Sequence, residues 1–402
     1  MRDYGRYHWK WLSGILMLLL LASACTKSSG VEEEQAEKPK LKIYVFAPDR
    51  PIVTRADNGD VDASEAENKI HNLHVWVFEN HTAEGDPKPE DDGKYVGHIS
   101  LNNIDISQSG STVTMELSDN FALLENKPKV DVYVVANVTA ANCGLTLSGT
   151  TTRDQLVAAM IGENYFGVTN LIKTVPADGL PMSGVMKNKR VTGNSPVYQV
   201  SESEEDGGQM ANVKLVRAVS KIRFVFSLST SNPDEVKVNN ITLGTSENKV
   251  LPKQEYLFVN DAGPDEYVPA TQLVSEVTTI HKNTSPASYS WDGTMSGQDY
   301  ERLIQTGIDE GKLSDLGTFY LRESDKPLAG TISYTISHTV NGVTTPTTKT
   351  PLFTMKDAGD FSRNHTWIVY SYFVSSGDLI MGMVEVKGWS NSEVSPQYVY
   401  NW

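Results

Sequence analysis

Hydrophobic and polar residues alternate with a period of two along most of the chain. Segment 41–47 shows the pattern clearly, because one of its two faces consists of Leu41, Ile43, Val45 and Ala47. Similar segments, rich in Val, Ile, Tyr and Thr and separated by Asn, Asp, Gly or Pro, lie at 70–78, 95–101, 111–117, 130–138, 213–227, 239–243, 330–336 and 367–374. Such runs between turn residues predict β-strands, and their succession predicts an all-β fold of the sandwich class.

Two segments break the alternation and predict helices. Segment 152–161 opens with a Thr cap, has Asp154 in its first turn, and places Leu156, Val157 and Met160 on one buried face. Segment 299–310 is a second helix candidate. We therefore expect an all-β protein with one or two short helices.

The length of the chain indicates two domains. About 378 of the 402 residues follow the N-terminal leader described below, which is more than one hydrophobic core usually supports. The polar segment 201–209 is the best candidate for a boundary, placed to within about ten residues. We expect a leader at 1–24, a tether with the first strand at 25–55, and two tandem β-sandwich-like domains at 56–212 and 213–402.

The first 25 residues have the pattern of a secretory leader. Arg2, Arg6 and Lys10 precede an uncharged apolar run at 11–21, which is too short to span a bilayer as a helix. Small residues then lead to Cys25, although Ala22 stands where a lipoprotein signal usually has Leu. We predict cleavage before Cys25 and lipidation of this residue, which would hold the precursor on a membrane surface. An ordinary signal peptide is the alternative.

Charge and cysteine content exclude several classes of protein. The net charge is −15 and becomes more negative once the basic leader is removed, so binding to nucleic acid or to anionic lipid by charge is disfavoured. The chain has two cysteines, and if Cys25 is lipidated then Cys143 is alone, which excludes a disulfide framework and a cysteine-based metal site.

The search for catalytic or metal-binding motifs favours a protein without enzymatic activity. His71 and His74 point to opposite faces of a strand, which disfavours a shared metal. The acidic segment 57–62 departs from the spacing of a calcium loop and indicates an acidic turn. The chain carries none of the sequence motifs of phosphate-binding loops, serine hydrolases, zinc proteases or dinucleotide-binding folds. We expect no catalysis, no cofactor and no metal.

The two ends of the chain indicate a different kind of function. Segment 51–56 should be exposed, so an arginine-specific protease could cut after Arg55 and leave Ala56 as the new N-terminus; Arg50 is a second candidate. At the C-terminus, Tyr398, Tyr400 and Trp402 share one face of an extended segment. If the first strand left its sheet, a strand from another subunit could fill the groove. The alternative is that Arg55 is an ordinary surface residue and Trp402 packs on its own domain.

The chain resembles the Bacteroidales fimbrillin family, the type V pilins. The resemblance rests on Cys25, on Thr-Arg-Ala at 54–56, and on motifs that occur in order over nearly the whole length: IHNLHVWVF (70–78), VYVVAN (132–137), LPMSG (180–184), LVRAVSKIRF (215–224), Arg-Asn-His (363–365) and Gly-Trp (388–389). It implies two transthyretin-like β-sandwich domains, export as an outer-membrane lipoprotein, cleavage after Arg55 and polymerisation by strand exchange. The donor strand maps onto about 394–402, where Pro396 is a departure because proline cannot donate to a ladder.

The predicted function is that of a structural pilin subunit in a cell-surface fimbria that supports adhesion. The expected partners are other copies of the chain, other fimbrial subunits, an arginine-specific protease, the outer membrane through the lipid on Cys25, and a host glycan or protein. Segments 180–184 and 363–365 are expected to hold turns and core packing. Two alternatives stay open: a tip adhesin, and a glycan-binding outer-membrane lipoprotein that does not polymerise.

Overall fold

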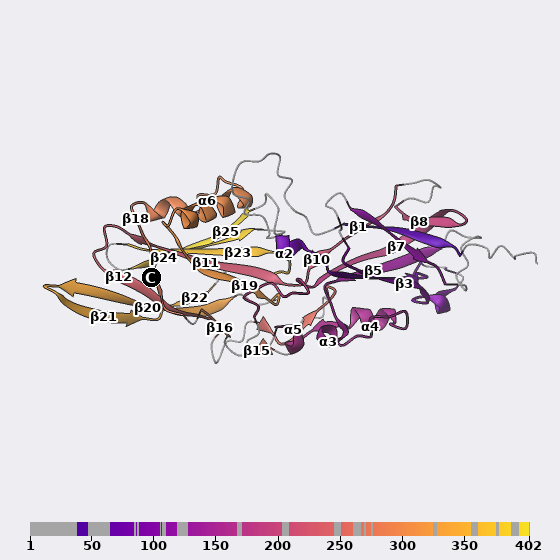
Figure 1. Cartoon of the computed structure of the whole chain (residues 1–402), viewed down its shortest axis with the longest axis horizontal. Helices are drawn as coiled ribbons and strands as arrows, with labels where there is room; N and C mark the ends of the chain where they lie inside the picture. The colour runs from indigo at the N-terminus through magenta and orange to yellow at the C-terminus, as the bar shows by residue number, and fades with distance from the viewer. Residues whose placement is uncertain are drawn as a thin grey trace, which may run out of the picture. The chain divides into compact units, whose positions relative to one another are not determined.

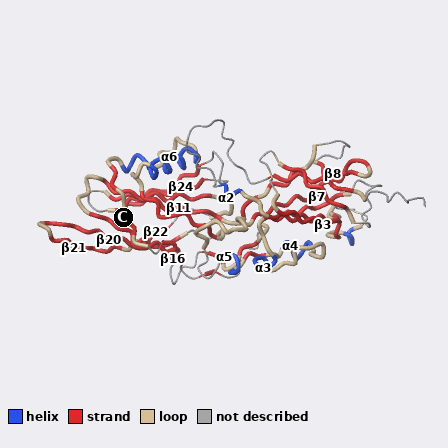
Figure 2. The backbone as a smooth tube through the Cα atoms, in the orientation of Figure 1, coloured by secondary structure: helices blue, strands red, loops and turns tan. Residues whose placement is uncertain are grey.

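In the computed structural model, strands make up about half of the described backbone, and the longest described helix has 13 residues (Figure 2). Contacts divide the chain into two units, 1–39 and 40–402, and every described helix and strand lies in the second unit. From residue 383 onward, the backbone alone is described. The described residues are 38–46, 65–83, 86, 88–104, 106, 110–118, 128–166, 171–202, 209–244, 251–259, 267–268, 271–274, 276–324, 328–354, 361–374, 378–386 and 394–401.

One sheet collects the strands of the first half of the chain (Figure 1). Its order is β3-β2-β5-β7-β8-β1-β4, with β9 beside β1 and β10 beside β7. The Ser118 amide donates to the Val96 carbonyl, which joins the two ends of this order and closes the sheet around a core. The strands are β1 (Lys40–Phe46), β2 (Asn72–Glu79), β3 (Tyr95–Asn102), β4 (Ser111–Glu116), β5 (Lys129–Ala136), β7 (Met182–Asn194), β8 (Val197–Ser201), β9 (Asn212–Lys214) and β10 (Val216–Arg217).

The central strands β2 and β5 bury both of their faces. Val75 and Val77 face the aliphatic core inside the closed sheet. Trp76 and Phe78, which alternate with them, face a second core under three short helices, α3 (Ala140–Cys143), α4 (Arg153–Val157) and α5 (Glu163–Phe166). The period-two pattern therefore places aliphatic residues on one side and aromatic residues on the other. The strands between two cores are almost continuously hydrophobic for this reason.

The second half of the chain forms a sandwich of two sheets. One has the order β18-β11-β23-β24-β25 with β19 beside β11; the other has the order β16-β12-β20-β21 with β17 beside β12 and β22 beside β20. Phe224 and Trp367 from the first sheet and Ile241 and Ile332 from the second lie in one core. The strands are β11 (Ser220–Ser229), β12 (Glu235–Leu243), β16 (Thr271–Val274), β17 (Thr278–Thr279), β18 (Lys282–Asn283), β19 (Ser314–Leu321), β20 (Ala329–Val340), β21 (Val343–Lys349), β22 (Leu352–Thr354), β23 (Thr366–Phe373), β24 (Leu379–Val386) and β25 (Val394–Asn401).

Short elements complete the described structure. Helix α6 (Gly297–Asp309) is capped by the Ser296 hydroxyl and packs Tyr300 and Ile304 on the outer side of β23 (Figure 1). Two short strand pairs add β13 (Leu251–Pro252) to β15 (Tyr267–Val268), and β14 (Glu255–Tyr256) to β6 (Met160–Ile161). The remaining helical turns are α2 (Glu65–Asn68), η1 (Pro89–Asp91) and η2 (Pro286–Tyr289). No described helix is long and apolar enough to cross a membrane.

The all-β prediction is confirmed, and the predicted strands are found close to their expected positions. The single long strand expected at 213–227 is wrong, because this stretch is divided into β9, β10 and β11. Apart from β6, which pairs with β14, strands up to Arg217 pair within the first sheet and strands from Ser220 onward pair with one another. The domain boundary expected from the sequence stays a prediction.

The helix expected at 152–161 is also shorter than predicted. Thr152 caps it as expected, but α4 ends at Val157, and Met160–Ile161 pairs as β6 with a strand almost a hundred residues away. Leu156 is buried, whereas Val157 is 39% exposed and Met160 only partly buried. Long-range pairing has therefore overridden the local helical pattern. The second helix candidate is present as α6.

Candidate functional site

Strand β1 occupies an interior position of the first sheet, although it lies at the start of the described chain. It pairs antiparallel with β4 along its whole length, with Ile43 opposite Val113. On its other side it pairs in parallel first with β8 and then with β9. Removal of β1 would therefore leave two unpaired strand edges facing one gap.

The inward face of β1 is completely buried. Leu41, Ile43 and Val45 each have 0% exposure and belong to the core of the first sheet. Burying an aliphatic side chain of this size contributes about 1.5–3 kcal/mol, so the three together contribute about 5–9 kcal/mol. The sequence placed these residues on one face correctly; their fourth member, Ala47, lies outside the described residues.

A glycine turn covers the outward face of β1. The rings of Tyr44 and Phe46 meet edge to face at 4.9 Å between centroids. Gly110 has φ +85°, and a Cβ atom built on it would lie 2.8 Å from the Tyr44 ring and 3.1 Å from the Phe46 ring. Only glycine fits this position without strain.

Among the described strands, the C-terminal strand β25 lies at the edge of its sheet and pairs with β24 alone. Tyr400 and Pro396 each pair with a residue of β24. Tyr398 lies where the pairing register of the two strands shifts, between Gly382 and Met383. An edge position tolerates a proline, because one side of the strand has no ladder to maintain. In this structure the segment expected to act as a donor is thus an edge strand of its own chain.

The remaining residues expected to be modified or cut are not described. Cys25, Arg55, Ala56 and Trp402 all lie outside the described residues, as does the acidic segment 57–62. The last described residue before the expected cleavage site is Phe46, and the chain is described again from helix α2. Their lipidation, cleavage and donor roles stay predictions.

Helix α2 holds a buried carboxylate against strands of the second half. The Glu67 carboxylate, 2% exposed, lies 3.1 Å from the Lys221 ammonium and accepts a hydrogen bond from the Tyr320 hydroxyl. Burial would raise the pKa of Glu67, but Lys221, Tyr320 and Arg217 outweigh it and lower the pKa below its usual value. Helix α2 is therefore fixed by charge as well as by packing.

The same cluster joins two of the motifs that carry the fimbrillin resemblance. Arg217 has no exposed surface and donates to the Glu67 carbonyl at 3.2 Å, to the Asn68 amide oxygen, and to the Asn364 amide oxygen at 2.9 Å. Asn364 adopts a left-handed φ of 59°. The motif residues thus pair with each other inside the protein, in agreement with a role in turns and core packing.

A second buried ionic cluster surrounds the neighbouring motif residue Arg363. Its guanidinium lies 2.7 Å from Glu255 and 2.6 Å from Glu323, and it also donates to the carbonyls of Tyr256 and Leu257. Burial opposes ionisation of Glu323, but the hydrogen bonds from Arg363 lower its pKa to about 2. Burial next to Glu323 raises the pKa of Glu255. Strand β14, which pairs with β6, is anchored by this cluster.

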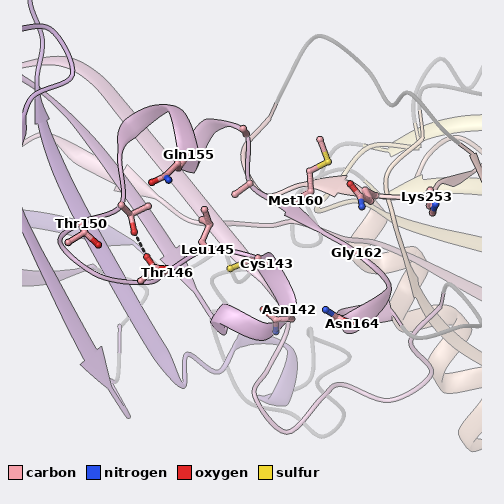
Figure 3. Close-up of a pocket in the computed structure, with 15 residues that line it drawn as sticks. Asn142, Cys143, Leu145, Thr146, Thr150, Gln155, Met160, Gly162, Asn164 and Lys253 are labelled. Carbon is pink, nitrogen blue, oxygen red and sulfur yellow. Dashed lines mark hydrogen bonds between the residues drawn. The ribbon is translucent and has the colours of Figure 1, made fainter.

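A polar pocket of about 830 Å³ lies beside helices α3 and α4 (Figure 3). The Asn142 and Gln155 amide oxygens accept bonds from the N-cap amides of Thr139 and Thr152 at 2.8 and 2.9 Å. Within the described chain, no partner is found for the NH₂ groups of Asn142 and Gln155. The side-chain amides of Asn142 and Gln155 are therefore fixed in position, and their NH₂ groups can donate hydrogen bonds to a neutral polar ligand in the pocket.

The two histidines considered from the sequence have separate environments. The His71 amide donates to the Asn137 side chain at 2.7 Å. The rings of His74, Trp76 and His98 contact one another in a cluster of three, with the His74 and His98 ring nitrogens 3.4 Å apart. Burial lowers the pKa of His98 to about 4, so this ring is neutral at physiological pH. Cys143 is a free, buried thiol.

Comparison with known families finds a match over the first half of the chain. Residues 40–220 match the model of the family described as major fimbrial subunit protein (FimA). This part of the chain is similar to the FimA fimbrial-subunit family. The match begins at β1 and ends at the change of sheet. The fimbrillin resemblance is confirmed, and the matched family is one of fimbrial subunits.

Individual relatives agree with this family. The minor fimbrium tip subunit Mfa3 of Porphyromonas gingivalis is 24% identical over 230 residues, which are 56% of this chain and 45% of Mfa3, so the chain spans less than half of that relative. A candidate cell adhesion protein of Parabacteroides distasonis has the same fold, with a TM-score of 0.50, 15% identity and coverage of 91% of this chain and 97% of that one. A fimbrial assembly protein of the same species aligns with a TM-score of 0.42, 15% identity and coverage of 89% and 98%.

Sequence reasoning missed the residues that hold the two buried ionic clusters. Arg217 and Lys221 are charged residues in a hydrophobic stretch, and this pattern could have indicated buried ion pairs. Glu67 and Glu255 gave no such signal, because each lies in a polar stretch that is typical of a surface.

Proposed function

We propose that this chain is a structural subunit of a cell-surface fimbria, exported as a lipoprotein, cleaved after Arg55 and polymerised by donor-strand exchange. The similarity of residues 40–220 to the FimA family supports the fimbrial part of this proposal. The observation that carries the assembly mechanism is the position of β1, which precedes Arg55 and fills an interior slot of the sheet.

Cleavage after Arg55 would separate β1 from the rest of the chain. Its departure would uncover the groove that now holds Leu41, Ile43 and Val45, together with the edges of β4, β8 and β9. A strand from another subunit can restore both ladders and fill the three apolar positions. Because the donor and the groove are different surfaces, such contacts repeat head to tail and form an open filament.

Strand β25 is the proposed donor. It is bound on one side only, so it has a single ladder to break before it can leave its own sheet. Tyr398, Tyr400 and Trp402 would then enter the neighbouring groove with alternate side chains. The precursor would be held at the outer membrane by the lipid on Cys25, and cleavage would release the mature subunit from that anchor.

The proposal is tested by digesting the purified precursor with an arginine-specific protease. We expect a new N-terminus at Ala56 and SDS-resistant ladders of multimers on gels of unheated samples. Arg55→Ala should abolish both, while Arg50→Ala, the matched control five residues away, should leave both intact. Deletion of 398–402 should keep the cleavage and abolish the ladders. Ladders that persist after this deletion, or fail to form after correct cleavage, would refute the strand-exchange mechanism.

The lipoprotein part has a separate test. Metabolic labelling with a radioactive fatty acid should label the precursor and leave the mature subunit unlabelled. Cys25→Ala should remove the label. An unlabelled precursor would refute lipidation and would not contradict the assembly mechanism.

A second candidate function is that of a tip adhesin or an anchored, glycan-binding lipoprotein. Two observations favour it: the similarity to a protein described as a fimbrium tip subunit, and the pocket with fixed amide groups. A glycan array probed with the whole chain distinguishes the two. Binding that is lost in Gln155→Ala, together with a failure to form ladders, would favour the adhesin.

A further inference from the structure

A cluster of one histidine and three carboxylates lies where β2 ends and the connection to β3 begins. The imidazole Nε2 of His81 is 2.9 Å from the Glu79 carboxylate, and its Nδ1 is 2.9 Å from the Asp86 carboxylate. Asp91, in η1, completes a group in which one ligand atom each from Glu79, His81 and Asp91 lie within 4.8 Å of one another. The cluster is separate from β1, from β25 and from the polar pocket.

Backbone contacts hold the cluster in place. The His81 amide donates to the Asp92 carboxylate at 2.9 Å, and the Lys88 amide donates to the Asp86 carboxylate at 2.9 Å. The Glu79 carbonyl accepts a bond from the Gly93 amide at 2.9 Å. The side chains of Glu79 and His81 are only 12% and 15% exposed. The potential ligands therefore come from a rigid strand end and a tied loop, which favours a preformed site.

The cluster contains more carboxylates than the neighbouring cations balance. Arg153 lies 2.5 Å from Asp92 and 3.4 Å from Asp131, so these two carboxylates already have a cation. Glu79, Asp86 and Asp91 face the imidazole and Lys94, whose ammonium is 3.6 Å from Asp91 on a side chain that is 48% exposed. Lys129 adds a weaker, more distant positive charge. A bound divalent cation would balance the excess of carboxylates.

We propose that Glu79, His81 and Asp91 bind a divalent transition-metal ion of the Zn²⁺ type, with Asp86 orienting the imidazole. A zinc-binding histidine commonly donates its other ring N–H to a carboxylate, and Asp86 stands in that position. The Nδ1–H then points to Asp86, and the Nε2 lone pair faces the other two ligands. One imidazole and two carboxylates are a donor set that suits zinc, with water in the fourth position.

Two ligands have to move to accept the ion: the Asp91 oxygen, within 4.8 Å of the other two ligand atoms, moves inward by up to about 1.5 Å, and the Glu79 carboxylate moves outward. With bonds of about 2.0–2.1 Å, two ligand atoms of a tetrahedral zinc site lie about 3.3 Å apart. The present separation between His81 and Glu79 is 2.9 Å, so the Glu79 carboxylate has to move outward by about 0.4 Å. Binding would link the end of β2 to η1 and so fix both ends of the β2–β3 connection.

Calorimetry with the full chain, freed of any histidine tag and of metal, tests the proposal. We expect one equivalent of Zn²⁺ to bind, and Co²⁺ to give the visible absorption of a four-coordinate site with nitrogen and oxygen ligands. His81→Ala should abolish stoichiometric binding. Asp86→Asn should retain the site but weaken it about 10- to 100-fold, because this residue acts through the imidazole.

His338→Ala is the matched control. His338 also pairs with one carboxylate, that of Asp234, but in the described chain it belongs to no group of three ligands. This variant should bind Zn²⁺ as the unaltered protein does. If His81→Ala does not fold, Asp91→Asn replaces it, since this side chain lies on a surface turn and is 27% exposed.

Three results would overturn the proposal. Absence of Zn²⁺ binding by the unaltered chain would mean that the cluster is an ion pair between His81 and its two carboxylates. Binding that persists unchanged in His81→Ala and Asp91→Asn would place the metal elsewhere. Binding of Ca²⁺ or Mg²⁺ in preference to Zn²⁺ would also refute it, because these ions favour sites made of oxygen ligands alone.

Discussion

Substitutions at Ile43 and at Val113 should affect the stability of the precursor and the stability of the assembled fimbria differently. The two residues are register partners in β1 and β4, are 0% and 2% exposed, and belong to the same core. If cleavage after Arg55 removes β1, Ile43 is lost with it, whereas Val113 stays and lines the groove. Ile43→Ala should therefore destabilise only the precursor, and Val113→Ala should destabilise both states.

The magnitude follows from burial. Truncating a fully buried Ile to Ala costs about 2–5 kcal/mol, including the cavity that remains. Val113→Ala removes about 1.6 kcal/mol of transfer free energy, to which the cavity adds. For a domain of this size, a loss of about 2–5 kcal/mol lowers the melting temperature by about 4–20 °C.

Differential scanning calorimetry of the precursor, and heating of assembled multimers in SDS, measure the two effects. We expect Ile43→Ala to lower the melting temperature of the precursor and to leave the dissociation temperature of the multimers unchanged. Val113→Ala should lower both. The reasoning fails if Ile43→Ala does not change the precursor, or if it weakens the multimers as much as Val113→Ala does.

Three further changes should affect stability in ways that the structure specifies. Glu67→Gln removes one partner of a buried ion pair and should cost about 3 kcal/mol in urea unfolding at pH 7. Folding lowers the pKa of Glu67, so its carboxylate contributes to the free energy of unfolding above the usual pKa of 4.5, and this contribution declines as the pH falls below that value. Between pH 5 and about pH 3, Glu67→Gln should therefore lose less stability than the unaltered chain. Gly330→Ala places a Cβ atom against the Thr242 carbonyl of the paired strand, and should cost about 2–3 kcal/mol or prevent folding; an unchanged melting curve would contradict this close approach. Gly110→Ala should lower the melting temperature of the precursor, at a cost of about 1–3 kcal/mol, because alanine at φ +85° strains the turn over Tyr44; equal stability would show that the turn can move away.

The arrangement of the two cores explains why alternation alone was an incomplete guide. In β2, both sets of alternating residues are buried, one against aliphatic side chains and one against aromatic side chains. The pattern identified the strand but could not show that its second face is covered by helices. The same limit applied to 152–161, where pairing of β6 with β14 ended a helix that the local pattern favoured.

The pattern of residues by itself determined the fold class, most of the strands and the burial of Leu41, Ile43 and Val45. Local alternation and turn residues suffice for these, because a strand with one buried face needs a period of two whatever its neighbours are. The ordered motifs also indicated the fimbrial-subunit family that residues 40–220 confirm.

Only the tertiary structure decided which distant residues meet. Strand β1 is an interior strand because β8 and β9, more than 150 residues later, lie against it, and no local signal specifies such a partner. In the same way, Glu67 meets Lys221, and His81 meets Asp91, through the path of the backbone. A strand held between two ladders and a histidine surrounded by carboxylates are properties of these contacts, and they exist only once the chain has folded.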